Sequence, residues 1–340
     1  CSSDLESAKA PLIMVGGGAT EASVEVRALA ERLGAVVIAS TAGKGIVADD
    51  HPLSLSASTI RKEVLRYLPE ADVILAVGTE LSETDSFVDR LDLRGQLIRI
   101  DIDPVKVTDV YPAAVGIVAD AKDAMASLGA RLSRVDPRSG DAARAKVSAL
   151  RSEITANLSR SQRRHTALLA MLERIAPDNA VWAGDACQLV YTGSFMLPTR
   201  APRQWFYPAG YCAIGNALPN AIGAKLARPQ SPVAVLVGDG GFMFTSPELL
   251  TAAELRLPLP IIIWENDGLK QIQDDMDARG IRRIGVEGIN PDFVALAHAC
   301  RCHGVLPDSA AAFESAFCAA LVADRPTVIV VREDSSWLAE

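Results

Sequence analysis

The chain of 340 residues lacks several features that identify common classes of protein. No apolar run reaches the roughly 18–20 residues that a membrane-spanning helix requires. The first ten residues, CSSDLESAKA, have neither a basic start nor an apolar core, so they do not resemble a signal peptide. Lys and Arg number 34 against 42 Asp and Glu, and the net charge of -8 argues against nucleic acid or an anionic membrane surface as a partner.

Signatures of several enzyme classes are also missing. The sequence contains no GxSxG, HExxH or Walker motif. The glycine-rich stretch VGGGATE (15–21) has Glu21 where a dinucleotide fingerprint has its third glycine, which argues against NAD. The six cysteines have no framework spacing, so we expect reduced thiols and a cytoplasmic protein.

Apolar runs of strand length alternate with helical patterns along the whole chain. This alternation predicts an α/β fold with two doubly wound parallel-sheet domains. The predicted strands lie at 11–17, 35–40, 71–78 and 96–103 in the first half, and at 180–185, 232–240, 259–267 and 326–334 in the second. Helices are expected at 21–34, ending at Gly34, and at 246–256 and 291–301.

A polar segment with almost no strand pattern separates the two halves. It covers residues 133–160, and we predict a linker with helical character there. This places a middle domain at 8–132 and a second domain at 161–336.

Two predicted strands of the second half end in oxygen-bearing side chains beside glycine, at Asp239 in VGDGG and at Asn266 in WENDG. Ligands of open parallel sheets bind beyond the carboxyl ends of the strands. A carboxylate, an amide oxygen and a following backbone carbonyl would suit Mg²⁺, which completes its shell with phosphate oxygens and water. Each motif alone is typical of an ordinary turn. Asn266 follows Asp239 by 27 positions, however, which is room for one helix and one strand and favours a shared site.

The residues after Asp239 suggest what the metal would accompany. We expect Gly241 and Phe242 to open a loop before a helix that begins near TSPE (245–248). Exposed backbone amides at such a helix start favour an anionic diphosphate.

This pair of motifs resembles the fingerprint of the thiamine diphosphate (ThDP) enzyme family, in which GDG is followed after some two dozen residues by NN or a variant. The chain has GDG at 238–240 and END at 265–267. GYCAIGNALPNAIGA (210–224) is similar to the family segment that packs the pyrimidine and thiazolium rings, and residues 15–52 resemble its middle domain.

The resemblance implies a set of site residues. Asp239 and Asn266 would bind Mg²⁺ with their side chains and Gly268 with its carbonyl. Ile214 would be the bulky residue that bends the cofactor into a V shape, and the carbonyl of Cys212 would accept a hydrogen bond from the pyrimidine amine. The implied cofactor-binding residues are Ala186, Cys187, Gln188, Cys212, Ile214, Gly238, Asp239, Gly240, Gly241, Phe242, Asn266, Gly268 and Leu269.

Two departures from the family pattern matter. Glu265 stands where the family usually has the first Asn of NN. The family also activates its cofactor with a glutamate on an N-terminal pyrimidine-binding domain, and nothing before residue 11 could be such a domain. We therefore expect no catalytic residue in this chain, weak cofactor binding by the chain alone, and a pyrimidine-binding domain supplied in cis or in trans within a homodimer or homotetramer.

The resemblance implies ThDP- and Mg²⁺-dependent decarboxylation or carboligation of a 2-oxo acid. Residues 78–87 and 266–273 depart from the acetolactate synthase pattern with its flavin contact, so FAD is not expected. Residues 271–293 look closer to decarboxylases of basic 2-oxo acids such as 5-guanidino-2-oxopentanoate. Asp274, Asp275 and Asp277 could neutralise a guanidinium, or could simply form a solvated helix face. An acetolactate synthase large subunit, and a catalytically silent nucleotide-binding or subunit-interaction fragment, remain alternatives.

Overall fold

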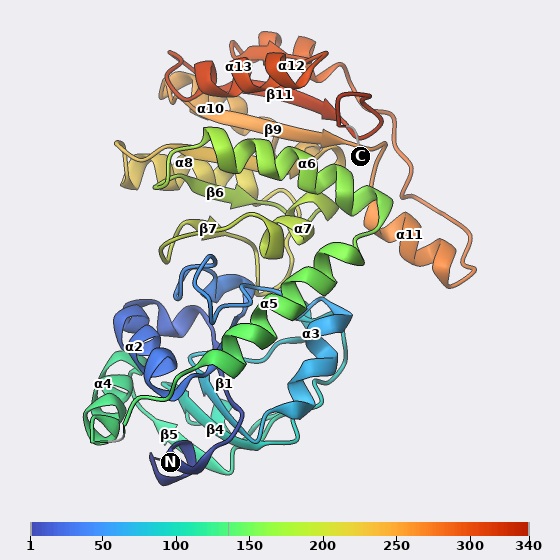
Figure 1. The fold of residues 1–340 in the computed structure, drawn as a ribbon. Coiled ribbons are helices and arrows are strands. Elements are labelled where there is room, and N and C mark those ends of the chain that lie inside the picture. Colours follow the sequence, from blue (N-terminus) through green and yellow to red (C-terminus); the bar gives the residue numbers. More distant parts are fainter. Residues whose placement is uncertain (1, 135, 339–340) are drawn as a thin grey trace. The chain divides into compact units, whose positions relative to one another are not determined.

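The computed structural model describes residues 2–134 and 136–338, and these form two compact units (Figure 1). The first unit runs to Leu158 and also includes Pro198–Arg203. The second contains Ser159–Leu197 and the chain from Gln204 onward. Among the described residues, none of the helices combines the length and the apolar character that crossing a membrane needs.

The first unit is built on a five-stranded, fully parallel sheet with the order β2-β1-β3-β4-β5. Its strands are β1 (Pro11–Val15), β2 (Val36–Ala39), β3 (Val73–Val77), β4 (Gln96–Asp101) and β5 (Val115–Val118). Its helices are α1 (Ser2–Ser7), α2 (Ser23–Leu33), α3 (Lys62–Tyr67), α4 (Ala121–Leu132) and α5 (Asp141–Ala156), with short 3-10 turns at Gly17–Ala22, Thr41–Gly43, Leu68–Glu70, Glu83–Asp85 and Lys106–Thr108.

The four strands predicted in this half are confirmed. β1, β2 and β3 are uninterrupted apolar runs that are buried throughout, and β4 is buried in its centre. Helix α2 is also confirmed and ends at Gly34, which has the left-handed conformation of a C-cap at φ 60°. The edge strand β5 was not predicted, since its four residues alternate between partial burial and exposure and provide only a weak signal.

The second unit is built on a six-stranded parallel sheet with the order β10-β11-β9-β8-β6-β7. Its strands are β6 (Val181–Gly184), β7 (Trp205–Phe206), β8 (Val233–Gly238), β9 (Pro260–Glu265), β10 (His303–Val305) and β11 (Thr327–Arg332). Its helices are α6 (Arg160–Ile175), α7 (Gln188–Met196), α8 (Ala217–Ala227), α9 (Asp239–Thr245), α10 (Glu248–Glu254), α11 (Lys270–Ala278), α12 (Phe293–Ala299) and α13 (Ala310–Ala320). The predicted strands at β6, β8, β9 and β11 are confirmed, whereas β7 and β10 are too short to give a pattern.

Alternation along each central strand divides the second core into two layers. On β9, Ile261 and Ile263 pack with α8, α10 and α12, while Ile262 and Trp264 pack with α6 and α13 on the opposite face. Because both faces are covered, the strands read as continuous apolar runs rather than as an alternating pattern. Because the strands are buried on both faces, polar side chains are found mainly at the strand ends.

The polar segment 133–160 contains the 16-residue helix α5, which belongs to the first unit. Residues 198–203 belong to the same unit, which no local pattern predicted. There the buried carboxylate of Asp49 accepts hydrogen bonds from the backbone N–H (2.7 Å) and the hydroxyl (2.9 Å) of Thr199. The contact spans 150 positions and depends on tertiary structure alone.

The prediction of a loop at Gly241 and Phe242 is wrong. Both residues lie inside α9, which begins at Asp239 directly after the extended N-cap Gly238. A run of glycines indicates a loop by propensity, but the buried Phe242 packs edge-on against Phe293, with ring centroids 5.7 Å apart. Tertiary packing therefore overrides the local preference. The helix predicted after TSPE is present as α10.

Candidate cofactor-binding site

A cavity opens where the strand order of the second unit changes direction. The chain leaves β6 to form the edge strand β7 and returns on the other side of β6 as β8. In a doubly wound sheet, this switch point is where ligands bind. A cavity of about 210 Å³ lies there, between segments that follow β6, β8 and β9.

Eleven of the thirteen residues predicted to contact the cofactor line this cavity. They are Ala186, Cys187, Gln188, Cys212, Ile214, Gly238, Gly240, Gly241, Asn266, Gly268 and Leu269. The other two lie behind the lining. Asp239 is fully buried, and the side chain of Phe242 is part of the core.

Asp239 ties the end of β8 to the end of β9. Its Oδ1 accepts from the N–H of Gly240 at 2.7 Å. Its Oδ2 accepts from the N–H groups of Asn266 and Gly268, both at 3.1 Å, and from Nδ2 of Asn290 at 2.8 Å. The spacing between GDG and NDG therefore reflects a direct bridge between neighbouring strands. Asn290 was not predicted, because it lies 51 positions from Asp239 in an irregular segment.

The side chain of Asn266 is held by a residue that the sequence did not single out. Its Nδ2 donates to Oε2 of Glu333 at 2.9 Å, which leaves the amide oxygen as the group available to a cation. Glu333 directly follows β11, the neighbour of β9, and the register pairs Arg332 with Glu265. The same strand-end reasoning that identified Asp239 could have identified Glu333.

Two glycines shape the segments that border this cavity. Gly268 has φ 112°, and a Cβ there would lie 2.6 Å from the carbonyl oxygen of Val286. A Cβ on Gly240 would lie 2.9 Å from Cδ2 of Leu269. A side chain at either position would clash with these neighbours, so glycine lets the segments that border the cavity pack closely against each other.

The donor set fits a hard cation. The described residues contain no group of three or more His, Cys, Asp or Glu side chains placed to hold a metal ion. The candidate ligands are instead one carboxylate, one amide oxygen and one backbone carbonyl. Mg²⁺ accepts such a set when phosphate oxygens and water complete its octahedron. The residues present therefore fit a Mg²⁺-bridged diphosphate.

Asp185 is a further residue that the sequence did not single out, although it precedes the predicted Ala186. It is buried at the end of β6, and its carboxylate accepts from the N–H groups of Ala186 (2.7 Å) and Gly215 (2.9 Å). Burial raises the pKa of the Asp185 carboxyl group. The bond to Gly215 fixes the loop that carries Ile214, so this aspartate fastens one wall of the cavity to the sheet.

Cys187 also lines this cavity. Burial raises the pKa of this thiol to about 12, so it stays protonated at neutral pH and is not a nucleophile. The cavity wall is thus chemically inert at this point.

The three aspartates proposed to recognise a guanidinium all have partners on or beside α11. Oδ1 of Asp274 accepts from Nζ of Lys270 at 2.5 Å, and Asp277 forms a two-point pair with Arg283. Asp275 is exposed and accepts from Gln271 at 3.1 Å. The contacts of Asp275 and Asp277 favour a solvated helix face. Asp274 is partly buried and also accepts from Nε2 of Gln188 at 2.8 Å. Recognition of a guanidinium stays a prediction.

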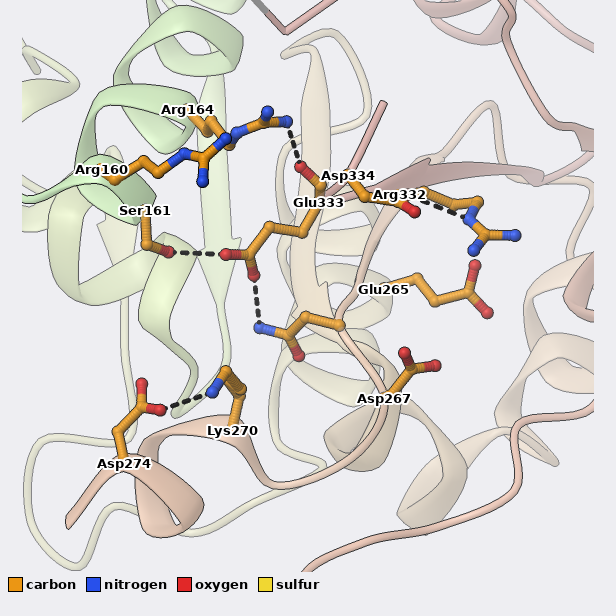
Figure 2. A pocket seen from close by; sticks show the side chains of 11 residues that line it. Arg160, Ser161, Arg164, Glu265, Asp267, Lys270, Asp274, Arg332, Glu333 and Asp334 are labelled. Atoms are coloured by element: carbon orange, nitrogen blue, oxygen red, sulfur yellow. Dashed lines mark hydrogen bonds and ion pairs between the residues drawn. The ribbon is translucent and has the colours of Figure 1, made fainter. Parts of the chain in front are cut away.

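A second, larger cavity of about 520 Å³ shares Asn266 and Lys270 with the first. Figure 2 shows Glu333 in its centre, bonded to Ser161 on one side. Charged groups of both signs surround it, and the lining residues are Arg160, Ser161, Arg164, Glu265, Asn266, Asp267, Lys270, Asp274, Arg332, Glu333 and Asp334.

Glu265, which replaces the usual Asn, faces this cavity. Burial raises the pKa of its carboxyl group, and its Oε1 lies 3.4 Å from Nδ2 of Asn290. The same amide nitrogen contacts Asp239, so Asn290 links the two carboxylates.

Comparison with known proteins agrees with this geometry. The family model described as the central domain of thiamine pyrophosphate enzymes matches residues 3–128, and the one described as their C-terminal TPP binding domain matches residues 185–331. The solved structure of a thiamine diphosphate-dependent 4-hydroxybenzoylformate decarboxylase from Rhodococcus jostii shares the fold, with a TM-score of 0.79 at 24% identity over 97% of this chain and 62% of that one.

Two curated relatives cover most of the chain. The protein named "Probable 2-ketoarginine decarboxylase AruI" of Pseudomonas aeruginosa is 44% identical over 88% of this chain and 53% of its own length. A probable acetolactate synthase large subunit of Methanocaldococcus jannaschii is 30% identical over 88% of this chain and 52% of its own length. The chain thus spans about half the length of these relatives. The two family models, the shared fold and the geometry of the strand ends together show that this chain belongs to the thiamine pyrophosphate enzyme family and carries its central and C-terminal domains.

Proposed function

We propose that this chain is the cofactor-anchoring part of an enzyme that uses thiamine diphosphate and Mg²⁺ to decarboxylate a 2-oxo acid. The observation that carries the proposal is the convergence of eleven predicted residues on one cavity at the switch point. When bound, the cofactor supplies the electron sink that loss of CO₂ from a 2-oxo acid requires. The chain would position the cofactor and provide the electrostatic field around it.

Each wall of the cavity has its own task in this proposal. Asp239, the amide oxygen of Asn266 and the carbonyl of Gly268 would hold Mg²⁺, and Gly240 and Gly241 would border the diphosphate. Asp185 holds the loop of Ile214, which would support the cofactor, and the carbonyl of Cys212 would accept from the pyrimidine amine.

We propose that the activating acid comes from a pyrimidine-binding domain, in cis or in trans. The described residues that line the 210 Å³ cavity include no Asp or Glu side chain. Three large apolar side chains beside the site are exposed: Tyr211 next to Cys212, Phe244 next to Gly215, and Ile289 next to Asn290. Exposed apolar groups gathered around a site favour a covering partner. A homodimer or homotetramer would provide one.

We propose 5-guanidino-2-oxopentanoate, also called 2-ketoarginine, as the substrate. The support is the 44% identity to the Pseudomonas protein named for that substrate. Acetolactate synthesis is the second candidate, supported by the relative at 30% identity.

The proposal includes neither FAD nor a membrane location. FAD is left out because residues 78–87 depart from the acetolactate synthase pattern with its flavin contact. The five described cysteines are thiols, which suits a cytoplasmic protein.

Calorimetry tests the proposal. The full protein, with its pyrimidine-binding domain, is titrated with thiamine diphosphate at several Mg²⁺ concentrations, as wild type and as Asp239→Ala. We expect Mg²⁺-dependent binding that the substitution abolishes. Absence of binding by the wild type, or binding that ignores Mg²⁺, would overturn the proposal and favour a silent nucleotide-binding or subunit-interaction protein.

Product analysis separates the two reactions. CO₂ release from 5-guanidino-2-oxopentanoate without acetolactate from pyruvate supports the decarboxylase. Acetolactate formation, especially with flavin absorbance in the purified protein, supports the synthase.

A further inference from the structure

We propose that Glu333 is a positioning residue for the metal, because it holds the side chain of Asn266 in the orientation that presents its amide oxygen. This inference rests on the proposed function, since it concerns the ligand set of the same Mg²⁺. It adds the residue that directly follows β11 to a site otherwise built from the ends of β6, β8 and β9.

The hydrogen bonds around Glu333 leave little freedom in the orientation of Asn266. An asparagine amide can rotate to exchange its oxygen and nitrogen, and a neighbouring partner decides between the two arrangements. Oε2 of Glu333 accepts from Nε1 of Trp264 at 3.1 Å as well as from Nδ2 of Asn266 at 2.9 Å. An ionised carboxylate can only accept, so the NH₂ group of Asn266 must face Glu333 and its oxygen must face away.

Glu333 is itself held from several directions (Figure 2). Its Oε1 accepts from the hydroxyl of Ser161 at 2.8 Å, and its N–H donates to the carbonyl of Glu265 at 2.9 Å. Arg164 donates to its backbone carbonyl at 2.7 Å. The bond to Glu265 extends the β9–β11 ladder by one residue and places Glu333 beside Asn266.

A buried layer supports these partners. His165 is 1% exposed, and its ring nitrogens lie 2.9 Å from Oγ1 of Thr192 and 3.3 Å from Oγ of Ser161. Its ring packs edge-on against Trp264, with centroids 4.8 Å apart. The acceptor for Asn266 is thus anchored to the core through α6 and α7 and not to a surface loop.

The consequence for a metal is electrostatic. If the amide of Asn266 turned over, its NH₂ dipole would point its positive end at the cation. Groups that orient a metal ligand typically change metal affinity by about 10–100-fold when they are removed. We expect the loss of Glu333 to fall in that range.

The test measures the Mg²⁺ affinity of the full protein at saturating thiamine diphosphate, by calorimetry. Glu333→Leu should raise the Kd for Mg²⁺ by about 10–100-fold. Glu333→Gln should stay close to wild type, because its oxygen still accepts from Trp264 and Asn266 and its NH₂ can donate to Ser161. Asp334→Leu is the matched control, since Asp334 lines the same cavity but pairs with Arg332 (3.3 Å).

A compensation experiment keeps the test decisive if Glu333→Leu does not fold. Asn266→Asp places a second carboxylate against Glu333 and should weaken Mg²⁺ binding. Combining it with Glu333→Gln supplies a donor to the new carboxylate and should restore part of the affinity, which a purely structural role would not do.

The outcomes separate this inference from the proposed function. If the wild type fails to bind thiamine diphosphate with Mg²⁺, both are overturned. If the wild type binds and Glu333→Leu binds Mg²⁺ equally well, only the role of Glu333 is overturned. The same holds if Asn266→Asp with Glu333→Gln binds no better than Asn266→Asp alone.

Discussion

The buried histidine behind the site should make the second unit sensitive to mild acid. Burial lowers the pKa of His165 to about 4, against about 6.5 in an unfolded chain. Below pH 6.5 the unfolded chain takes up a proton that the folded protein accepts only near pH 4. The free energy of unfolding therefore falls as the pH drops through this window, and the stability is regained as the pH rises.

The size of the effect follows from the two pKa values. The gap between about 6.5 and about 4 corresponds to a loss of about 3 kcal/mol once the pH is below both values. At pH 5 the folded protein still holds the ring neutral, so about 2 kcal/mol of that loss should already be present. A loss of this size is a large fraction of the stability of a typical domain.

Urea unfolding followed by tryptophan fluorescence provides the assay. All four tryptophans, at 182, 205, 264 and 337, lie in the second unit, so the signal reports that unit selectively. The comparison is between wild type and His165→Gln at pH 7.5 and pH 5. The variant lacks the titrating ring and should lose about 2 kcal/mol less than the wild type between these pH values. Equal losses in the two proteins would refute the reasoning.

Three further predictions concern the site. Gly268→Ala should destabilise the second unit by about 1–3 kcal/mol and abolish Mg²⁺-dependent cofactor binding. Gly280→Ala is the control, because Gly280 has φ 65° but lies in open space, and it should leave binding intact. Urea unfolding and calorimetry measure the two effects. Asp185→Ala should lower the free energy of unfolding by about 1–3 kcal/mol, because the N–H groups of Ala186 and Gly215 lose their acceptor. Asp185→Asn should have a smaller effect, and equal stability of the wild type and both variants would contradict the role of Asp185. Asp277→Asn should leave kcat/KM for a guanidino 2-oxo acid unchanged, because the carboxylate already pairs with Arg283; a large rise in KM would show direct recognition.

Much of the fold could be predicted from local pattern. Strands such as β3 and β8 are continuous apolar runs, because helices cover both faces of the parallel sheets. The edge strand β7 has only two residues, which are too few to show a periodic apolar pattern, so the sequence did not predict it. The helix α9 was missed for the opposite reason, since its glycines indicate a loop while the burial of Phe242 supports a helix.

The sequence by itself determined where a cofactor would be anchored. Parallel strands end at one edge of a sheet, so Asp239 and Asn266, each directly after an apolar run, had to lie near each other at that edge. Glycines beside them indicated room for a bulky anion.

Only the tertiary structure decided what holds that anchor in place. Asn290 reaches Asp239 across 51 positions, and Glu333 reaches Asn266 across 67. Asp185 reaches Gly215 across 30. These partners meet because β11 pairs with β9, β9 with β8, and β8 with β6, and this order is set by the packing of the whole unit. Local patterns predict where each strand ends, but contacts between distant segments decide which strands pair with each other.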